Sequence, residues 1–530
     1  MLQIVHVWLI CDMDGFQVKT TRNPLSIFNL SWELLAKELN EDNKNSKKRV
    51  YKLAKSMRKP QETRNVFKDK TGNLTSNPDK IAETWTHHFQ TLLNVDHPIL
   101  NHDNDVEYDP ESTDNDTDQE ITMEELEMAF KRMKNAKAPG PEKIPVELLD
   151  QPNIKNLLLK IINRAWTLGK IPTEWGKSII CPIYKKGDRN NCSNYRGISL
   201  MPHACKIYER ILEKRARAKI EPKLQEWQHA YRKGRSTSDL IFAIRQLTEK
   251  SWEYNQDLYI AFIDLTKAFD SVPRQNLWNV LSTKYDIKGR LLEAIKSTYD
   301  PCTCTVMTGY PHNKWFDVKS GVKQGSVLSP ILFIAYLDTV LQEVNKEQTD
   351  IFQTFGYADD ICQWERSIEA IKLALERYDN EFTNAGLKMN KASGKTEVLI
   401  FGRNPPKAEI TVNGDTIGRV EQAKYLGSVT TRESGNKAEI TERISNFSRQ
   451  AAALQPVLRD RLVSNEVKKT IFNTILKPVL LYGCESWVLT KKDISRLQAA
   501  EMKVVRTMLG KTRADRLRNT YLRETLGITS

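Results

Sequence analysis

Three aspartates stand where their side chains could bind divalent cations. Asp264 ends the apolar run LYIAFID, and Asp359 and Asp360 lie between two apolar runs in TFGYADDICQW. Adjacent carboxylates repel one another unless a cation lies nearby. Oxygen ligands of this kind suit Mg²⁺, which binds few protein carboxylates together with substrate phosphates. Two such ions can stabilise the attacking and the leaving oxygen of an in-line displacement, so the pattern indicates nucleotidyl transfer.

Such chemistry requires elements that bring the three acids together. LYIAFIDL, TFGYADDICQW and TEVLIFG are typical of buried strands. Helices are expected over 275–299, in ILFIAYLDTVLQEV after Pro330, and over 366–385. Strands separated by helices favour an α+β or α/β core. If the first two strands are neighbours, Asp264 and Asp359 converge at one sheet edge; a single aspartate after a strand is otherwise more often a turn residue or helix cap.

The flanking segments are predicted to be mainly helical. Residues 81–93 carry apolar side chains at helical spacing, and Thr122 with Glu125 forms a capping box that would open a helix over 122–134. The chain is expected to become helical after Leu426. One amphipathic helix there is marked by Ile494, Leu497, Val504, Val505 and Met508.

The charge of the chain is unevenly distributed. The 530 residues carry a formal net charge of +13, yet residues 101–120 hold nine acids and no lysine or arginine. Residues 431–530 hold 19 basic and 10 acidic residues. The acidic stretch is typical of a disordered linker, and the basic excess suits a nucleic-acid backbone, although solvated basic faces are also common. No apolar run approaches the ~20 residues of a membrane span, and scattered cysteines favour an intracellular compartment, nuclear or cytoplasmic.

Ordered motifs extend across most of the chain and resemble those of reverse transcriptases. The palm motifs are matched by FIDLTKAFDSV (262–272), SGVKQGSVLSPILF (320–333), YADD (357–360), GLKMN with KTEVLIF (386–401) and KYLG (424–427). The finger motifs are matched by 135–149, 181–201 and 228–239. Together with LLYGCESW (480–487) and KTRADRLRN (511–519), they are similar to the enzymes of non-LTR (LINE-type) retrotransposons.

This resemblance implies an α+β right-hand polymerase. Fingers and palm, an antiparallel sheet with packed helices, would occupy 121–430, and an α-helical thumb 431–530. Residues 1–100 would form a helical connector and 101–120 the acidic linker. The implied activity is RNA-directed DNA synthesis from an RNA template, a DNA primer and dNTPs, with two Mg²⁺ ions, which Mn²⁺ could replace.

The resemblance also implies roles for single residues around the nucleotide. Asp264, Asp359 and Asp360 would be the catalytic metal ligands. Phe269 would pack under the nucleotide sugar and exclude a 2′-hydroxyl. The nucleotide would also be contacted by Gln324, Gly325, Lys185, Arg196 and Lys395.

Lys395 follows Asn390 by five residues, where the family commonly spaces three, so Lys391 is an alternative to it. Asp270 is interpreted as a structural acid. Nucleic acid would be contacted by Arg235, by Tyr425 and Gly427 in a primer-grip turn, and by Lys511, Arg513, Arg516 and Arg518 in the thumb.

Two other functions stay open. The chain could be a catalytically silent relic that still binds nucleic acid, or an RNA-dependent RNA polymerase. No zinc knuckle is expected, because Cys484 is the one cysteine beyond residue 362 and all histidines precede residue 313. We expect a chain truncated at its C-terminus, with endonuclease activity supplied by another protein or by a lost domain.

Overall fold

A computed structural model describes residues 36–37, 40, 66–69, 71–95, 119–309, 314–346, 353–402, 409–432 and 435–529. The chain divides into two compact units, one spanning Arg64–Leu426 and the other Gly427–Ser530 together with Met1–Thr63. Nearly all of the predicted connector before residue 66 and of the acidic linker lies outside the described residues. The predicted domain boundaries stay predictions.

A six-stranded sheet in the first unit carries the three aspartates. Its order is β11-β12-β10-β5-β9-β8. The strands are β5 (Leu258–Ile263), β8 (Thr354–Tyr357), β9 (Asp360–Glu365), β10 (Glu397–Phe401), β11 (Ile410–Val412) and β12 (Asp415–Val420). The central strands β10, β5, β9 and β8 are antiparallel, as predicted, whereas β12 adds to β10 in parallel.

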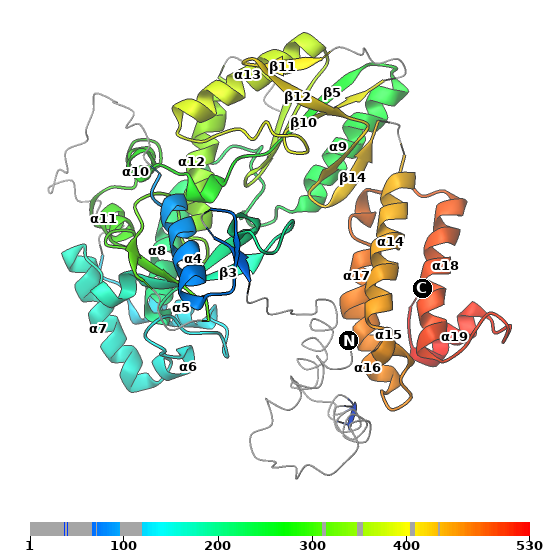
Figure 1. The fold of residues 1–530 in the computed structure, drawn as a ribbon, viewed down its shortest axis with the longest axis horizontal. Coiled ribbons are helices and arrows are strands. Elements are labelled where there is room, and N and C mark those ends of the chain that lie inside the picture. The colour runs from blue at the N-terminus through cyan, green and yellow to red at the C-terminus, as the bar shows by residue number, and fades with distance from the viewer. Residues whose placement is uncertain are drawn as a thin grey trace. The chain divides into compact units, whose positions relative to one another are not determined.

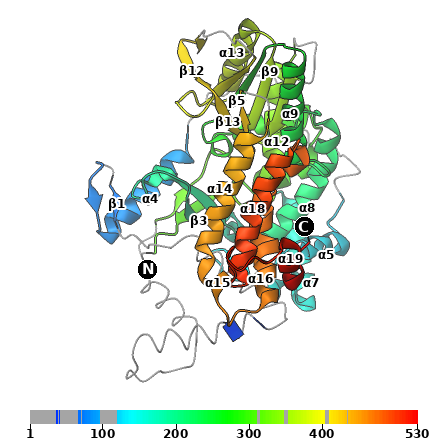
Figure 2. The same cartoon turned by 90° about the vertical axis from the view of Figure 1, so that its right-hand side faces the viewer.

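Every residue of β5 is buried because helices cover both faces of the sheet. Leu258, Ile260 and Phe262 pack with α9 (Thr237–Glu253) on one face. Figures 1 and 2 show this helix beside the sheet. The alternate residues face the core that holds α12 (Ser329–Val344) and α13 (Ile368–Asn384). Such double burial explains the continuous apolar run that marks this strand in the sequence.

A second sheet lies in the same unit. Its order is β4-β3-β6-β7, formed by Tyr195–Leu200, Lys177–Tyr184, Thr303–Val306 and Phe316–Asp317. Helix α4 (Pro78–Leu92) contributes Ile81, Trp85 and Phe89 to the apolar cluster on this sheet. The helix predicted over 81–93 is therefore confirmed. A small hairpin, β1 (Phe67–Lys68) with β2 (Leu74–Thr75), precedes α4.

Helices complete the first unit. They are α5 (Met123–Lys131), α6 (Val146–Leu149), α7 (Pro152–Leu168), α8 (His203–Ile220), α10 (Arg274–Thr283) and α11 (Gly289–Ser297). The capping box of Thr122 and Glu125 opens α5 as predicted. The prediction of one continuous helix over 275–299 is wrong. Asp286 adopts φ +53°, and this conformation interrupts the helical hydrogen bonding between α10 and α11.

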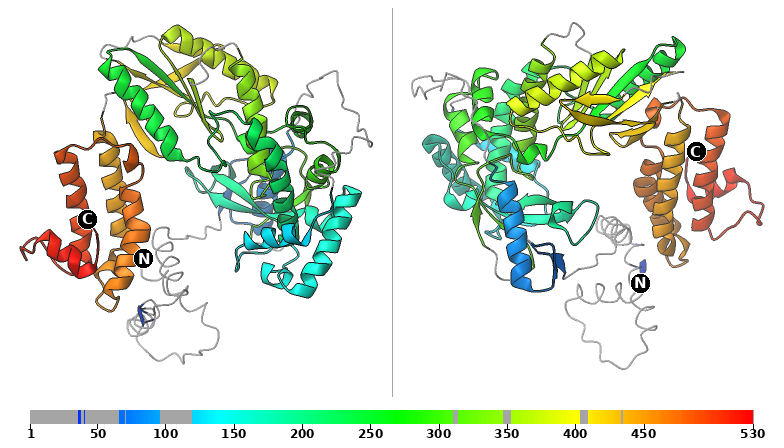
Figure 3. Two further views of the ribbon diagram at one scale, coloured as in Figure 1. Left: turned by 180° about the vertical axis from the view of Figure 1, so that it is seen from behind. Right: turned by 45° about the horizontal axis from the view of Figure 1, so that its top comes forward.

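The second unit is a helical bundle that starts with a strand. After β14 (Ser428–Thr431) come α14 (Lys437–Ala453), α15 (Gln455–Arg459), α16 (Asn465–Ile471), α17 (Lys477–Leu480), α18 (Lys491–Met508) and α19 (Asn519–Leu526), the orange and red helices of Figure 3. Leu497, Val505 and Met508 of α18 enter its core, whereas Ile494 is exposed, against expectation. Among the described residues no helix is both long and apolar enough to cross a bilayer.

Candidate active site

The three aspartates lie at one end of adjacent strands. Strand β5 pairs with β9 through Ile263 opposite Ile361, and Asp264 directly follows β5. Tyr357 pairs with Asp360, so the turn between β8 and β9 consists of Ala358 and Asp359. The sheet therefore brings Asp264 to the same edge as Asp359 and Asp360, the convergence expected from the sequence.

The Asp359 turn is supported from outside the sheet. Ala358 adopts φ +56°, a conformation that is costly for a residue with a Cβ. Its N–H donates to Oε1 of buried Gln228 at 3.2 Å, and His229 N donates to the carbonyl of Gly356 at 2.9 Å. The segment around Gln228 thus holds the turn. Sequence reasoning missed this supporting role because it assigned residues 228–239 to the fingers and to nucleic-acid contact.

The electrostatics of Asp360 show which charges surround the site. Burial raises the pKa of Asp360 to about 6, and the neighbouring Asp359 and Asp264 raise it further. Lys185 and Arg196 act in the opposite direction on the same pKa. Both cations are exposed. Lys185 directly follows strand β3, and Arg196 lies on strand β4. Three acids and two cations from distant parts of the sequence therefore share one electrostatic environment.

Asp264 is held by two side chains from the segment before β10. Its Oδ2 accepts from Asn390 Nδ2 at 2.8 Å and from Lys395 Nζ at 3.1 Å. Lys391 instead forms ion pairs with Asp379 at 2.7 Å and Asp415 at 3.0 Å. The geometry therefore places Lys395, and not the alternative Lys391, beside Asp264 despite its unusual spacing.

The acids fit a site completed by substrate. In the described part of the chain, no group of three or more His, Cys, Asp or Glu side chains is arranged to hold a metal ion by itself. Mg²⁺ commonly needs only one or two protein carboxylates together with substrate phosphates. Burial is the main cause of the raised pKa of Asp360, and the neighbouring Asp359 and Asp264 add negative charge that a divalent cation would offset. The donor set is therefore compatible with magnesium.

Gln324 and Gly325 lie in a tightly held loop before α12. Ser199 N of β4 donates to the Gln324 carbonyl at 2.7 Å, and Gly325 has φ +119°. A Cβ on Gly325 would lie 2.7 Å from the Ser199 carbonyl oxygen. The next two residues of the loop are held as well, because buried Glu209 accepts from Ser326 Oγ at 2.8 Å and from Val327 N at 3.0 Å. The glycine is needed for this close approach to β4.

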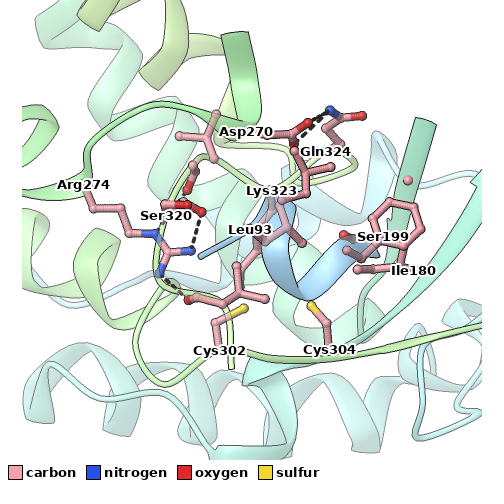
Figure 4. A pocket seen from close by; sticks show the side chains of 16 residues that line it. Leu93, Ile180, Ser199, Asp270, Arg274, Cys302, Cys304, Ser320, Lys323 and Gln324 are labelled. Carbon is pink, nitrogen blue, oxygen red and sulfur yellow. Dashed lines mark hydrogen bonds between the residues drawn. The ribbon is translucent and has the colours of Figure 1, made fainter. Parts of the chain in front are cut away.

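Asp270 takes part in the same arrangement. Both of its carboxylate oxygens accept from Gln324 Nε2 at 3.0 Å, and Figure 4 shows this contact at the rim of a pocket. The pocket is also lined by Arg274 and by Cys302 and Cys304. Burial raises the pKa of Asp270 to about 6, whereas Gln324, Lys267 and Arg196 lower it. Arg196 therefore acts to lower the pKa of both Asp270 and Asp360.

Phe269 lies next to Asp270 and is half-buried. Its ring stacks on Phe333 of α12 with centroids 4.1 Å apart. Val322 N donates to the Phe269 carbonyl at 2.8 Å, which ties the residue to the Gln324 loop. The stacking and the hydrogen bond thus fix the position of Phe269 in the chain segment between Asp264 and the loop that carries Gln324.

The predicted nucleic-acid contacts lie in several places. Tyr425 is buried, and its hydroxyl donates to the Asp360 carbonyl at 3.2 Å. Gly427 has φ +83°, and its carbonyl accepts from Arg443. Arg235 forms an ion pair with Glu226. The exposed loop between α18 and α19 carries Lys511, Arg513, Arg516 and Arg518.

Known proteins resemble this chain over the segments that contain the three aspartates. Residues 183–430 match the family model described as reverse transcriptase (RNA-dependent DNA polymerase). The chain is 26% identical over 397 residues to the probable RNA-directed DNA polymerase from transposon X-element of Drosophila melanogaster. It is 25% identical over 414 residues to the RNA-directed DNA polymerase from mobile element jockey of Drosophila funebris.

These alignments cover 72% and 74% of this chain but only 43% and 44% of the relatives. The chain therefore spans less than half the length of these relatives. Among solved structures, telomerase from Candida albicans in complex with a telomeric RNA fragment aligns over 100% of this chain and 96% of its own, with 12% identity and a TM-score of 0.40.

Proposed function

Residues 183–430 form a reverse transcriptase domain of the non-LTR retrotransposon type, and on this premise we propose that the chain is an RNA-directed DNA polymerase. The observation that carries the proposal is the meeting of Asp264 with Asp359 and Asp360 at one sheet edge. Lys185 and Arg196 act electrostatically on the same edge. Clustered acids with adjacent cations suit a reaction between a hydroxyl and a triphosphate.

In this reaction the primer 3′-hydroxyl attacks the α-phosphate of a dNTP, and pyrophosphate leaves. Asp264, Asp359 and Asp360 would hold two Mg²⁺ ions, with Mn²⁺ as a substitute. When bound, the ions would lower the pKa of the attacking hydroxyl and neutralise the departing oxygens. Lys185 and Arg196 would offset triphosphate charge, Arg196 as a forked donor.

Lys395 is the proposed proton donor to pyrophosphate. Its ammonium lies 3.1 Å from Asp264, so it reaches the acidic edge. A group within hydrogen-bonding reach of the reacting atoms can act as a general acid. Lys391, paired with two other aspartates, is not proposed for this role.

Phe269 supports a preference for deoxynucleotides over ribonucleotides. Its ring is fixed by stacking on Phe333 and by the hydrogen bond from Val322. A rigid aromatic ring beneath the sugar would leave no room for a 2′-hydroxyl. This argument favours a DNA polymerase over an RNA-dependent RNA polymerase.

The catalytically silent relic is the second candidate. It is motivated by the unusual spacing between Asn390 and Lys395. The contact between Lys395 and Asp264 and the supported Asp359 turn favour a working site instead.

Primer extension on an RNA template, with Mg²⁺ and dNTPs, tests the proposal. We expect extension by the wild-type chain and none above background for the double variant Asp359→Ala, Asp360→Ala. Equal extension by the wild type and the double variant would contradict the proposed polymerase activity. Phe269→Val should raise the ratio of rNTP to dNTP incorporation, and an unchanged ratio would contradict the role of the ring. Loss of extension with retained, salt-sensitive RNA binding would favour the relic.

The proposed partners are an RNA template, a DNA primer and dNTPs. The primer would be the end of a nicked DNA, with the nick made by another protein or another domain. We propose an intracellular location, nuclear or cytoplasmic. The exposed basic loop at 511–518 would contact the phosphate backbone, and backbone contacts lose affinity steeply with added salt.

A further inference from the structure

Cys302 and Cys304 form a pair of buried thiols that the proposed chemistry does not use. They stand at the start of β6 with one residue between them, and they are 4% and 3% exposed. Cys304 forms a hydrogen bond with the Cys302 sulfur, and Ser178 Oγ lies 3.0 Å from Cys304 Sγ. Two residues of extended chain cover about 6.6 Å, and the Cα atoms of a disulfide lie roughly 4.4–6.8 Å apart. The two sulfurs are therefore within bridging reach of each other.

Two cations lie beside this pair. Lys323 is 7% exposed and donates to the carbonyl of Thr298, and its ammonium lies 5.4 Å from the centre of the Tyr299 ring. Arg274 donates to the Tyr299 carbonyl at 3.0 Å. Burial acts to lower the pKa of Lys323, but negative groups around it, with Cys302 first among them, raise it above its usual value. Cys302 therefore supplies part of the charge that keeps this buried lysine ionised.

The protonation of the two thiols follows from their neighbours. The hydrogen bond from Cys304 lowers the pKa of Cys302, burial acts to raise it, and Lys323 and Arg274 lower it further, so the net shift is downward. The same hydrogen bond, together with burial, raises the pKa of Cys304. The thiolate is the nucleophilic form of cysteine, and neighbouring cations stabilise it. The pair therefore consists of a nucleophilic thiolate beside a protonated thiol.

A pocket gives small molecules access to both sulfurs. Cys302 and Cys304 line it together with Lys323 and Arg274, and Figure 4 shows the two cysteine side chains at the same end of it. Its free volume is about 30 Å³, and roughly 10–15 Å³ of such volume holds one water. Hydrogen peroxide has only two oxygen atoms and fits this space, whereas a bulky thiol reagent does not.

We propose that Cys302 and Cys304 form an oxidation site for hydrogen peroxide, at which Cys302 attacks the peroxide and Cys304 closes a reversible disulfide. When the Cys302 thiolate attacks one oxygen, an S–O bond forms, the O–O bond breaks, and the departing hydroxide takes up a proton from solvent. Cys304 then attacks the sulfenic sulfur, so that an S–S bond forms, the S–O bond breaks, and the departing hydroxide takes the proton of Cys304. The thiols lose two electrons to the peroxide, two waters are produced, and a dithiol reductant restores the pair.

Oxidation at this site acts on the loop that carries Gln324. It removes the negative sulfur beside Lys323, which directly precedes Gln324, and a buried cation that loses its counter-charge destabilises its surroundings. Gln324 in turn contacts Asp270 at 3.0 Å. The disulfide should therefore lower nucleotide incorporation reversibly. This consequence rests on the proposed polymerase function, whereas the oxidation site itself does not.

Peptide mass spectrometry of the full chain after peroxide treatment at pH 7 tests the site. We expect a disulfide between Cys302 and Cys304, with the peptide lighter by two hydrogen atoms. Cys192 is the matched control, because it belongs to the same apolar cluster, is 5% exposed, and has a pKa that burial raises to about 12. Cys302 should be oxidised about tenfold faster than Cys192 or more, because only the thiolate reacts. Equal rates for the two would overturn the inference, as would a disulfide from Cys302 to Cys205.

Two variants separate the roles of the neighbours. Lys323→Met removes the cation and keeps the length of the side chain, so the oxidation of Cys302 should slow about tenfold while that of Cys192 is unchanged. An unchanged rate for Cys302 would overturn the role of the lysine. In Cys304→Ser the sulfenic acid of Cys302 should persist and react with dimedone to a greater extent than in the wild type. Equal dimedone labelling would overturn the role of Cys304 as the closing thiol.

The two proposals fail in different ways. If the wild type extends no primer beyond the Asp359→Ala, Asp360→Ala background, the polymerase proposal fails, and the mass measurements still judge the thiol pair. In an active chain, peroxide should lower extension about threefold or more, dithiothreitol should restore it, and Cys302→Ser should resist the peroxide. Full extension by a chain in which the disulfide has formed would overturn its effect on the loop.

Discussion

Gly325→Ala is the most direct test of the loop that carries Gln324. Gly325 has φ +119°, where a residue with a Cβ costs about 1–2 kcal/mol. The new Cβ would also lie 2.7 Å from the Ser199 carbonyl oxygen, which belongs to the backbone of β4 and cannot rotate away. Overpacking of this kind costs about 1–3 kcal/mol. The variant should therefore lose about 2–5 kcal/mol.

The chain offers a matched control in Gly414→Ala. Gly414 also has a positive φ, +86°, but a Cβ there would meet no atom within 4 Å. This variant should lose only the conformational part, about 1–2 kcal/mol. The difference between the two variants isolates the close approach of the loop to β4.

Thermal unfolding and primer extension measure the two consequences. With about 360 residues in the unit, an unfolding entropy near 2.1 cal/mol/K per residue makes 1 kcal/mol worth about 1.3 °C. We expect Gly325→Ala to lower the Tm by about 3–7 °C and Gly414→Ala by about 1–3 °C. Only the former should impair extension, because it displaces Gln324. Equal Tm and equal activity for the two variants would refute the reasoning.

Three further predictions follow from the charged groups. Lys395→Ala should reduce nucleotide incorporation at least tenfold and Lys391→Ala less than threefold, because only Lys395 contacts Asp264; equal effects in single-turnover assays would contradict this difference. Burial raises the pKa of Asp270 to about 6. The free energy of unfolding therefore includes a contribution of about 3 kcal/mol that is present below pH 4 and is lost as the pH rises through 6. The Tm of wild type relative to Asp270→Asn should therefore fall between pH 4 and 7, and a constant difference would count against the shift. In the second unit, Glu439→Gln should cost about 3 kcal/mol, because it leaves buried Arg443 without its counter-charge at 2.6 Å; an unchanged denaturation curve would contradict the importance of this pair.

Much of the architecture could be predicted because local patterns carry it. The unbroken apolar run of β5 predicts a strand covered on both faces, and helices α9, α12 and α13 provide that cover. The capping box at Thr122 predicts the start of α5. The interrupted helix over 275–299 was missed, because apolar spacing continues across a break at Asp286 that only the backbone conformation reveals.

The sequence by itself determined which acids are available, their order, and the strands that end at them. Those features depend on residue type and on periods of two or 3.6 within one segment. The tertiary structure decided which lysine meets Asp264, that Gln228 supports the Asp359 turn, and that Asp270 orients Gln324. These contacts join segments up to about 130 residues apart, with Lys395 reaching Asp264 across 131 positions. Packing sets such distances, and no spacing along the chain encodes them.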